Sequence, residues 1–245
     1  MKLNNIRKFK NGGRNFLKIM RGNKTIWTRL YLAKDSDFEK FNPYPTGQAS
    51  VEYLRYIGTQ TNIEIPSTVK GETVNDCTLM FFNTKYTKLR VVSKNKVDKF
   101  SSMFRLCSSL KTLDLSSFDM SNAKELFYTF DGCHNLKSLV LGNLDGAKPT
   151  DLAGTFQGCS SLEKIDLSHL DTSNASDISN MFAGCSSLTT LDLSKFDISN
   201  VTNMKEMFEG CSSLKTIYVR SQADLDRFRN EGNLSESVNA IIKNL

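Results

Sequence analysis

MFAGCSSLTTLDLSKFDISNVTNM, residues 181–204, decides the fold, because the chain returns to this pattern several times. A cysteine recurs every 26 residues, with a phenylalanine three positions before it and a leucine three positions after it. The cysteines are Cys107, Cys133, Cys159, Cys185 and Cys211. A period of this length predicts a stack of units that bury their apolar sides only against one another. We therefore expect a solenoid.

Each unit contains an L-x-x-L-x-L core, which in the quoted stretch is Leu188, Leu191 and Leu193. The alternation of leucine with polar residues predicts a short strand whose alternate side chains face inward. The residues that follow, Phe196-Asp197 and Ser199-Asn200, favour a turn. Because every unit has its strand at the same place, we expect the strands to form a parallel sheet.

The second half of each unit predicts a short helix on the convex side of the solenoid. Val201, Met204, Met207 and Phe208 recur at spacings that suit one face of a helix. Gly210 follows where a helix C-cap is expected. The same place is held in earlier units by Gly132, Gly158 and Gly184.

Two less regular units precede these, one around Met80-Phe81 and one in NIEIPSTVKG at 62–71. The predicted fold is an α/β repeat, a right-handed leucine-rich-repeat solenoid with one parallel sheet of about seven short strands and short convex helices. A small N-terminal β-hairpin module is expected beside it. The predicted regions are a basic docking hairpin at 1–35, a linker or N-cap at 36–56, the solenoid at 57–219 and a C-terminal cap at 220–245.

The unit MFxGCSSLxxLDLSxFDxSNV resembles the BspA-type repeats, which are also classified as a domain of unknown function of bacterial surface lipoproteins. The resemblance covers roughly residues 57–219, and IEIPSTVKG at 63–71 resembles the related proline-bearing class of the same superfamily. It implies a leucine-rich-repeat scaffold that binds host matrix proteins, glycans or other bacteria. Many members of that family carry secretion signals and surface anchors.

Residues 1–34 form a basic segment with ten lysines and arginines and no acidic residue. FLKIMRGNKTIWTRLYL at 16–32 predicts two short strands around Gly22-Asn23. The stretch from Ile6 to Trp27 resembles short N-terminal segments of phage and prophage structural proteins. Those segments attach a variable domain to the virion. The resemblance implies a docking role for Arg14, Lys18, Arg21, Lys24, Trp27 and Arg29.

The composition is typical of a folded soluble domain, with 39% apolar and 24% charged residues. No apolar run reaches the roughly 18–20 residues that span a bilayer, and the N-terminus lacks the apolar core of a secretory signal. We expect neither export by the general route nor a membrane anchor, and no cofactor. A basic segment can contact nucleic acid or anionic lipid, but a docking arm or solvated edge is commoner, so neither is an expected partner.

The recurring cysteines allow three interpretations. Metal sites contain close cysteine pairs with further His or Cys ligands, and only His134 and His169 are available here. Disulfides between neighbouring units are geometrically conceivable, but five equivalent positions leave one unpaired. Buried thiols that fill the interior are the favoured interpretation, and Cys77 is expected to be buried as well.

Calcium binding and catalysis receive little support from the sequence. The recurring Asp119, Asp145, Asp171 and Asp197 are interpreted as caps of loop backbone, because calcium loops place several ligands two residues apart in one loop. The serines recur in CSSL and LDLS and therefore serve the scaffold, and no nucleophile motif accompanies the histidines. We expect a protein that is not an enzyme, and we assign no catalytic or metal-ligating residue.

The outward positions of the strands are the candidate binding surface. Hydroxyl and carboxylate side chains belong to the repeat there, so residues that depart from the repeat are the favoured contacts, particularly tyrosine and arginine. The departures are Arg90, Val140, Lys164, Tyr218 and Arg220. The repeat members Asp114, Asp166 and Asp192 complete the candidate site.

Together these features lead us to expect a phage or prophage virion component of the tail or a fibre. It would dock through residues 1–35 and bind a host surface protein or glycan with the solenoid, as a monomer or an oligomer. The alternative is a BspA-like adhesin of the bacterial cell surface, or a protein interaction module of the cytoplasm. A third class, a nucleic-acid binder, predicts steeply salt-dependent DNA affinity.

Overall fold

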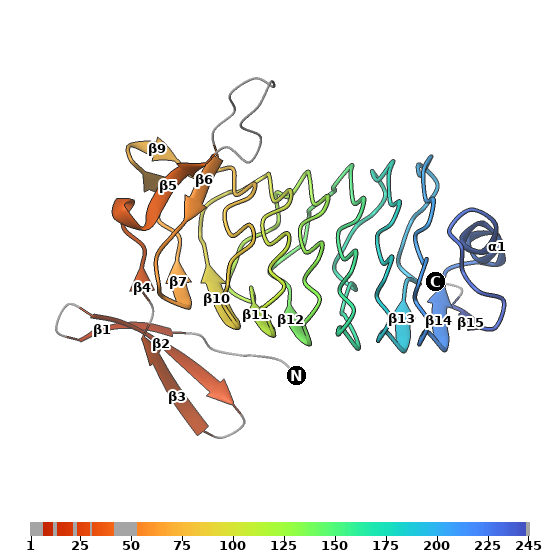
Figure 1. Ribbon diagram of the computed structural model, residues 1–245, viewed down its shortest axis with the longest axis horizontal. Helices are drawn as coiled ribbons and strands as arrows, with labels where there is room; N and C mark the ends of the chain where they lie inside the picture. The colour runs from red at the N-terminus through yellow and green to blue at the C-terminus, as the bar shows by residue number, and fades with distance from the viewer. Residues whose placement is uncertain (1–6, 12–13, 22–23, 30, 42–52, 244–245) are drawn as a thin grey trace.

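The computed structural model describes residues 7–11, 14–21, 24–29, 31–41 and 53–243, with the side chains of 32–40 and 53–243. Its body is a solenoid of parallel strands stacked along one axis (Figure 1), which confirms that part of the prediction. We number its seven rungs by the residues at the strand position. These are 62–64, 88–92, 112–114, 138–140, 164–166, 190–192 and 216–219.

Six of these rungs contain a strand at that position. The strands are β7 (Asn62–Glu64), β10 (Lys88–Val92), β11 (Thr112–Asp114), β12 (Ser138–Val140), β13 (Thr190–Asp192) and β14 (Thr216–Val219). Two strands extend the row at its ends: β4 (Tyr31–Leu32) pairs with β7, and β15 (Asn239–Ile242) pairs with β14, both in parallel. Neighbouring rungs keep a fixed register, so equivalent residues lie side by side.

The prediction of one continuous sheet is wrong, because the described strands form two parallel sheets. Their orders are β4-β7-β10-β11-β12 and β13-β14-β15, and rung 5 between them has no strand. Rung 4 beside the break has Val140-Leu141-Gly142 where rungs 3, 5 and 6 have Asp-Leu-Ser. In those three rungs the aspartate accepts a hydrogen bond from the serine N–H and shapes the strand end. Rung 4 lacks this turn, and regular pairing stops after it.

The predicted convex helices are also absent from the described rungs, where consecutive tight turns replace them. The N–H groups of Asn180, Phe182 and Gly184 donate to carbonyls of the next rung at 2.9, 3.0 and 2.6 Å. The N–H groups between them, such as that of Ala183, donate three residues back. Asn180 and Gly184 have φ of 55° and 72°, in the left-handed region that an α-helix cannot contain. The glycines that sequence analysis assigned to helix C-caps, such as Gly184, therefore serve these turns.

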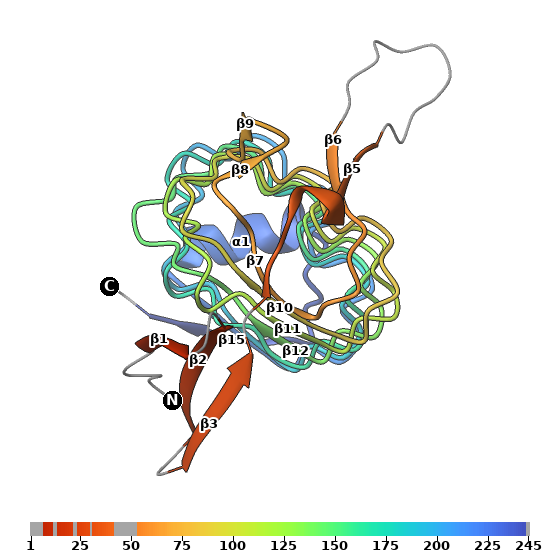
Figure 2. The same ribbon diagram turned by 90° about the vertical axis from the view of Figure 1, so that its left-hand side faces the viewer.

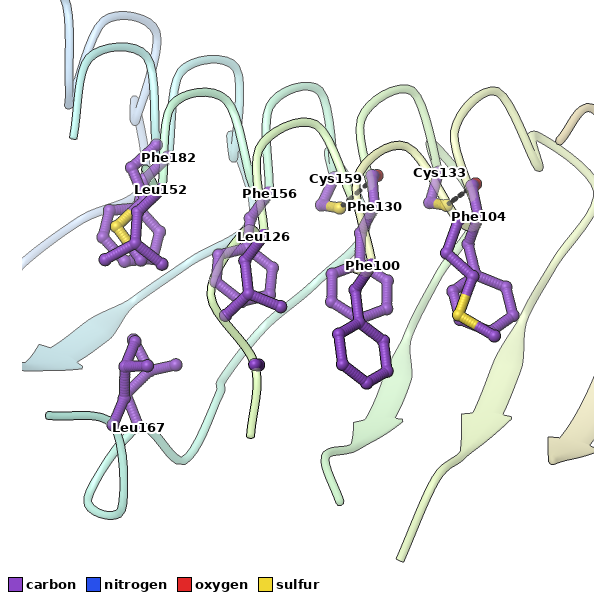
Figure 3. Close-up of a cluster of buried hydrophobic side chains, with 14 of the residues drawn as sticks. Phe100, Phe104, Leu126, Phe130, Cys133, Leu152, Phe156, Cys159, Leu167 and Phe182 are labelled. Carbon is purple, nitrogen blue, oxygen red and sulfur yellow. Dashed lines mark hydrogen bonds between the residues drawn. The ribbon is translucent and has the colours of Figure 1, made fainter. Parts of the chain in front are cut away.

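The core is a column of phenylalanine rings, one from each turn segment (Figure 3). Successive rings from Phe81 to Phe208 stack nearly parallel, with centroids 5.2–6.1 Å apart and interplanar angles of 12° or less. Tyr56 closes the column at one end and Phe228 at the other, and both meet the last ring at an angle. The rings are almost completely buried, so removing any one of them would leave a cavity between two rungs.

A column of cysteines runs beside the rings, as the sequence predicted. The thiols of Cys133 and Cys159 donate to the carbonyls of Phe104 and Phe130 at 3.2 and 3.3 Å (Figure 3). The Cys185 thiol likewise donates to the Phe156 carbonyl at 3.1 Å. All described cysteines are free thiols, and all are buried except Cys211, which is half-buried in the last regular rung. Cys77, outside the regular spacing, is buried too, as expected.

The remaining elements cover the two ends. The 3₁₀ turn Asp35–Asp37 leads into β5 (Phe38–Phe41), which pairs antiparallel with β6 (Tyr53–Tyr56). A short pair follows, β8 (Thr68–Val69) with β9 (Glu72–Thr73). At the other end α1 (Gln222–Asn230) lies across the solenoid (Figure 2). Ser221 caps its N-terminus, accepting from the Asp224 N–H at 3.1 Å.

Three described strands between residues 7 and 29 form an antiparallel sheet. These are β1 (Arg7–Asn11), β2 (Arg14–Arg21) and β3 (Lys24–Arg29), in the order β1-β2-β3. The sequence predicted two strands in this part of the chain, and β1 is the strand that it missed. The Gly22-Asn23 turn expected between the strands lies outside the described residues, while Arg21 and Lys24 on either side of it are paired.

The left-handed turn positions generate a stability prediction. Gly184→Ala is expected to lower the free energy of unfolding by about 1–2 kcal/mol, because a side chain at φ 72° is strained and its Cβ would lie 3.4 Å from Gly158. Asn180→Gly, at the other left-handed position of the same rung, should leave that free energy unchanged or raise it. Urea unfolding of both variants measures the difference. Equal destabilisation by the two substitutions would contradict this account of the turns.

Candidate ligand-binding face

The parallel register brings most of the predicted site residues into one row on the strand side of the solenoid. Arg90 pairs with Asp114 and Asp114 with Val140 in the first sheet. Asp192 pairs with Tyr218, and Tyr218 with Ile241, in the second. Successive members of such a row stand about 4.8 Å apart. We call this row, together with Lys164 and Asp166 at the corresponding places of rung 5, the strand face.

At the early end of the strand face, Arg90 forms an ion pair and a hydrogen bond with neighbouring residues. Its Nη1 lies 3.2 Å from the Asp114 carboxylate, and its Nη2 donates to the Ser117 hydroxyl at 3.1 Å. Only 13% of the Arg90 side chain is exposed, and burial lowers the pKa of its guanidinium below the ordinary value. Arg90 and Asp114 therefore brace rungs 2 and 3, and Arg90 offers little free surface.

At the late end, a lysine that sequence analysis missed covers the face. Lys243 Nζ lies 2.8 Å from the Asp192 carboxylate and 4.2 Å from the centre of the Tyr218 ring. The contact to Tyr218 has the geometry of a cation–π interaction. Lys243 lies beyond the repeats, 51 residues after Asp192. No periodic signal could have found it, because only the path of the C-terminal segment brings it to this place.

Arg220, the last departure from the repeat, points to the C-terminal cap. Its Nη1 lies 3.3 Å from the Asp197 carboxylate, and its Nε donates to Asp224 of α1 at 3.2 Å. Hydrogen bonds from Ser199, with the help of Arg220, lower the pKa of Asp197 to about 2. Asp224 is 7% exposed, so Arg220 supplies the counter-charge for a buried carboxylate.

The middle of the strand face remains open to solvent. Val140 is 42% exposed and is one of few large apolar side chains exposed on the described surface. Lys164 and Asp166 on rung 5 are exposed as well. The Asp166 carboxylate accepts from the Ser168 N–H at 3.0 Å, and hydrogen bonds from Ser168 lower its pKa. Val140, Lys164 and Asp166 are thus the predicted site residues that the fold leaves available.

The predicted docking residues belong to the N-terminal sheet. Arg14, Lys18 and Arg21 lie on β2, and Lys24, Trp27 and Arg29 on β3. The register places Lys18 opposite Trp27 and Arg21 opposite Lys24. Their side chains lie outside the described residues, so the docking role remains a prediction.

Neither a candidate metal site nor a helix that could cross a membrane is found among the described residues. No group of three or more His, Cys, Asp or Glu side chains is placed to hold a metal ion there. Within the same residues, no helix combines the length and apolar character that crossing a bilayer requires.

Comparison with known proteins places the repeats in a family. A family model described as "Mycoplasma protein of unknown function, DUF285" matches residues 59–144 and 98–221, which together cover more than half of the chain. No curated protein and no solved structure matches the chain.

The cysteine column generates a prediction of pH dependence. Burial raises the pKa of Cys185 well above its ordinary value of 9.0 and that of Cys211 to about 12. The neutral thiol therefore stabilises the fold fully below pH 9, and this stabilisation is lost as pH rises toward 12. Each such thiol should steepen the alkaline loss of stability by up to about 1.4 kcal/mol per pH unit.

Urea unfolding between pH 8 and pH 11 measures this loss. Cys211→Ser should show a shallower decline than the wild type, because serine does not titrate in this range and its hydroxyl can still donate to the Phe182 carbonyl. Identical slopes for the two proteins would show that the Cys211 thiol makes no contribution.

Proposed function

This chain belongs to the DUF285 family, and from that premise we propose that it is a non-catalytic binding protein whose strand face holds the partner. The solenoid is interpreted as a leucine-rich-repeat variant in which tight turns take the place of convex helices. The L-x-x-L-x-L core of the repeat supports this interpretation.

The observation that carries the proposal is the row of aligned outward side chains. Parallel pairing holds Asp114 beside Val140 and Asp192 beside Tyr218 at a fixed spacing on rigid backbone. Such a row is preorganised, so a partner that contacts several rungs loses little additional conformational entropy of the protein. Exposed Val140 offers apolar contact, and exposed Lys164 and Asp166 offer charge on the next rung. A host surface protein or glycan is the proposed partner.

The strand face generates a binding prediction. Val140→Lys should weaken binding of the labelled protein to intact cells by about tenfold or more, because a charge replaces an apolar contact at the centre of the surface. The fold should tolerate the lysine, since residue 140 is exposed and faces Asp114 in the neighbouring strand. Flow cytometry with a panel of wall-less, Gram-positive and Gram-negative bacteria, and with cultured animal cells, measures binding.

Leu106→Lys is the matched control. Leu106 is 41% exposed, like Val140, but it lies in a turn outside the strand face. Retained binding by this variant and lost binding by Val140→Lys would support the proposal. Equal binding by all three proteins, or no binding of the wild type to any cell, would refute it. Binding confined to animal cells would favour the adhesin alternative over the phage component.

The finer proposal is that the chain is a virion component that docks through residues 1–35. The basic charge of this segment supports it, as does the β1-β2-β3 sheet, whose strands pair only with one another among the described residues. The resemblance of residues 6–27 to N-terminal segments of phage structural proteins adds to this support. A BspA-like adhesin or an intracellular interaction module is the alternative, supported by the repeat itself.

Electron microscopy of purified particles from a strain that encodes the chain, combined with antibody labelling, tests this location. The proposal expects label at a tail or fibre. Particles that lack the chain altogether, in a strain that expresses it, would exclude the virion role and leave the strand-face proposal intact.

A further inference from the structure

A polar cleft of about 400 Å³ opens between the loops that follow the strand position in rungs 4, 5 and 6. Asp145 comes from rung 4, Ser168, His169 and Asp171 from rung 5, and Lys195 from rung 6. The buried Leu170 also lines it. The cleft is wide open to solvent, so a ligand there would remain partly exposed, and none of its residues was among the predicted site residues.

Asp145 differs from the aspartates at the same place in other rungs. Those aspartates accept from the N–H two residues later at 2.9–3.0 Å, as Asp119, Asp171 and Asp197 do. After Asp145 the corresponding N–H, of Ala147, donates to the Leu144 carbonyl at 2.9 Å instead. The Asp145 carboxylate is therefore released from capping its own loop.

The released carboxylate meets a histidine of the next rung. Asp145 Oδ1 lies 2.8 Å from His169 Nδ1, and the two side chains are 71% and 67% exposed. His169 also departs from the repeat, since Ser117, Asn143 and Lys195 hold its place in other rungs. Two neighbouring rungs thus depart from the pattern at positions that meet, and the scaffold uses neither side chain to cap a loop.

The groups around the cleft supply both hydrogen-bond donors and acceptors without a dominant charge. Asp145 and Asp171 offer carboxylates, although Asp171 already caps its loop and lies 3.5 Å from Lys148. Lys195 offers an ammonium group that has no ion pair among residues 53–243. A hydroxyl group can donate to a carboxylate and accept from an ammonium or imidazole N–H. Hydroxyl groups on a neutral ligand match this set of donors and acceptors.

We propose that the cleft formed by Asp145, His169 and Lys195 binds a neutral saccharide. This inference rests on the proposed binding function and names the chemistry of part of its partner. Asp145 would accept from one sugar hydroxyl, while Lys195 would donate to another. His169 would hold Asp145 in place through the 2.8 Å contact and line the opening.

The two histidines of the chain provide a site-specific test. Proton NMR of the full chain, titrated with glucose, galactose, mannose and N-acetylglucosamine to millimolar concentrations, follows both imidazole signals. Binding in the cleft should shift the His169 signals saturably with at least one sugar. The His134 signals should stay in place, because His134 contacts the Gly158 carbonyl and does not line the cleft. His169→Gln assigns the signals.

Asp145→Asn is expected to weaken the sugar affinity, measured from the saturable His169 shift, by about tenfold, since it removes a charged hydrogen-bond acceptor. The matched control is Asp226→Asn, the same change at an exposed position of α1, which should leave the affinity unchanged. Lys195→Gln should also weaken binding, whereas Lys205→Gln, on a turn outside the cleft, should not.

The proposal is overturned if no sugar shifts His169, or if Asp145→Asn and Lys195→Gln bind as the wild type does. Shifts of both histidines alike would equally overturn it, because they indicate binding without a site. Failure of the saccharide proposal can be distinguished from failure of the strand-face proposal. If Val140→Lys weakens cell binding but no sugar shifts the His169 signals, the proposed function is retained and only the saccharide cleft is excluded.

Discussion

Backbone hydrogen bonds between rungs are the interaction on which the rest of the structure depends. In the turn segments every second N–H donates to the next rung, as from Phe104 to the Thr129 carbonyl at 2.8 Å and from Phe130 to the Thr155 carbonyl at 2.9 Å. A rung alone would leave these groups unpaired and its phenylalanine ring half covered. Stability therefore comes from contacts between neighbours, and both ends need caps. β5–β6 with Tyr56, and α1 with Phe228, meet this need.

This dependence explains why so many repeated side chains are unavailable for recognition. The cysteine thiols donate to carbonyls of the previous rung, and most loop aspartates accept from N–H groups two residues later. Even some departures from the repeat serve the scaffold. Arg90 braces two rungs, and Arg220 supplies the counter-charge for Asp224 of the C-terminal cap. What remains for a partner is the exposed middle of the solenoid, around Val140, Lys164 and the Asp145–His169 pair.

The break in the sheet coincides with this exposed region. Rung 4 lacks the Asp-Leu-Ser strand end at Val140-Leu141-Gly142, and its next loop contains the unusual Asp145. Gly142 itself approaches the Phe118 carbonyl so closely that a Cβ would lie 2.3 Å from that oxygen, so the backbone permits no other residue without rearrangement. The same short stretch thus interrupts the regular pairing and presents the side chains that the proposals concern.

The period of 26 residues by itself determined that the chain is a solenoid of parallel strands with a ladder of buried thiols, because only stacking lets identical apolar residues cover one another. It could not distinguish helices from turns. Apolar residues three apart, as at Val201, Met204 and Met207, suit both. Left-handed residues and backbone hydrogen bonds between rungs decide in favour of turns. Tertiary structure alone decided which outward residues are free. Lys243 reaches Tyr218, and His169 reaches Asp145, across distances in sequence that no local pattern encodes.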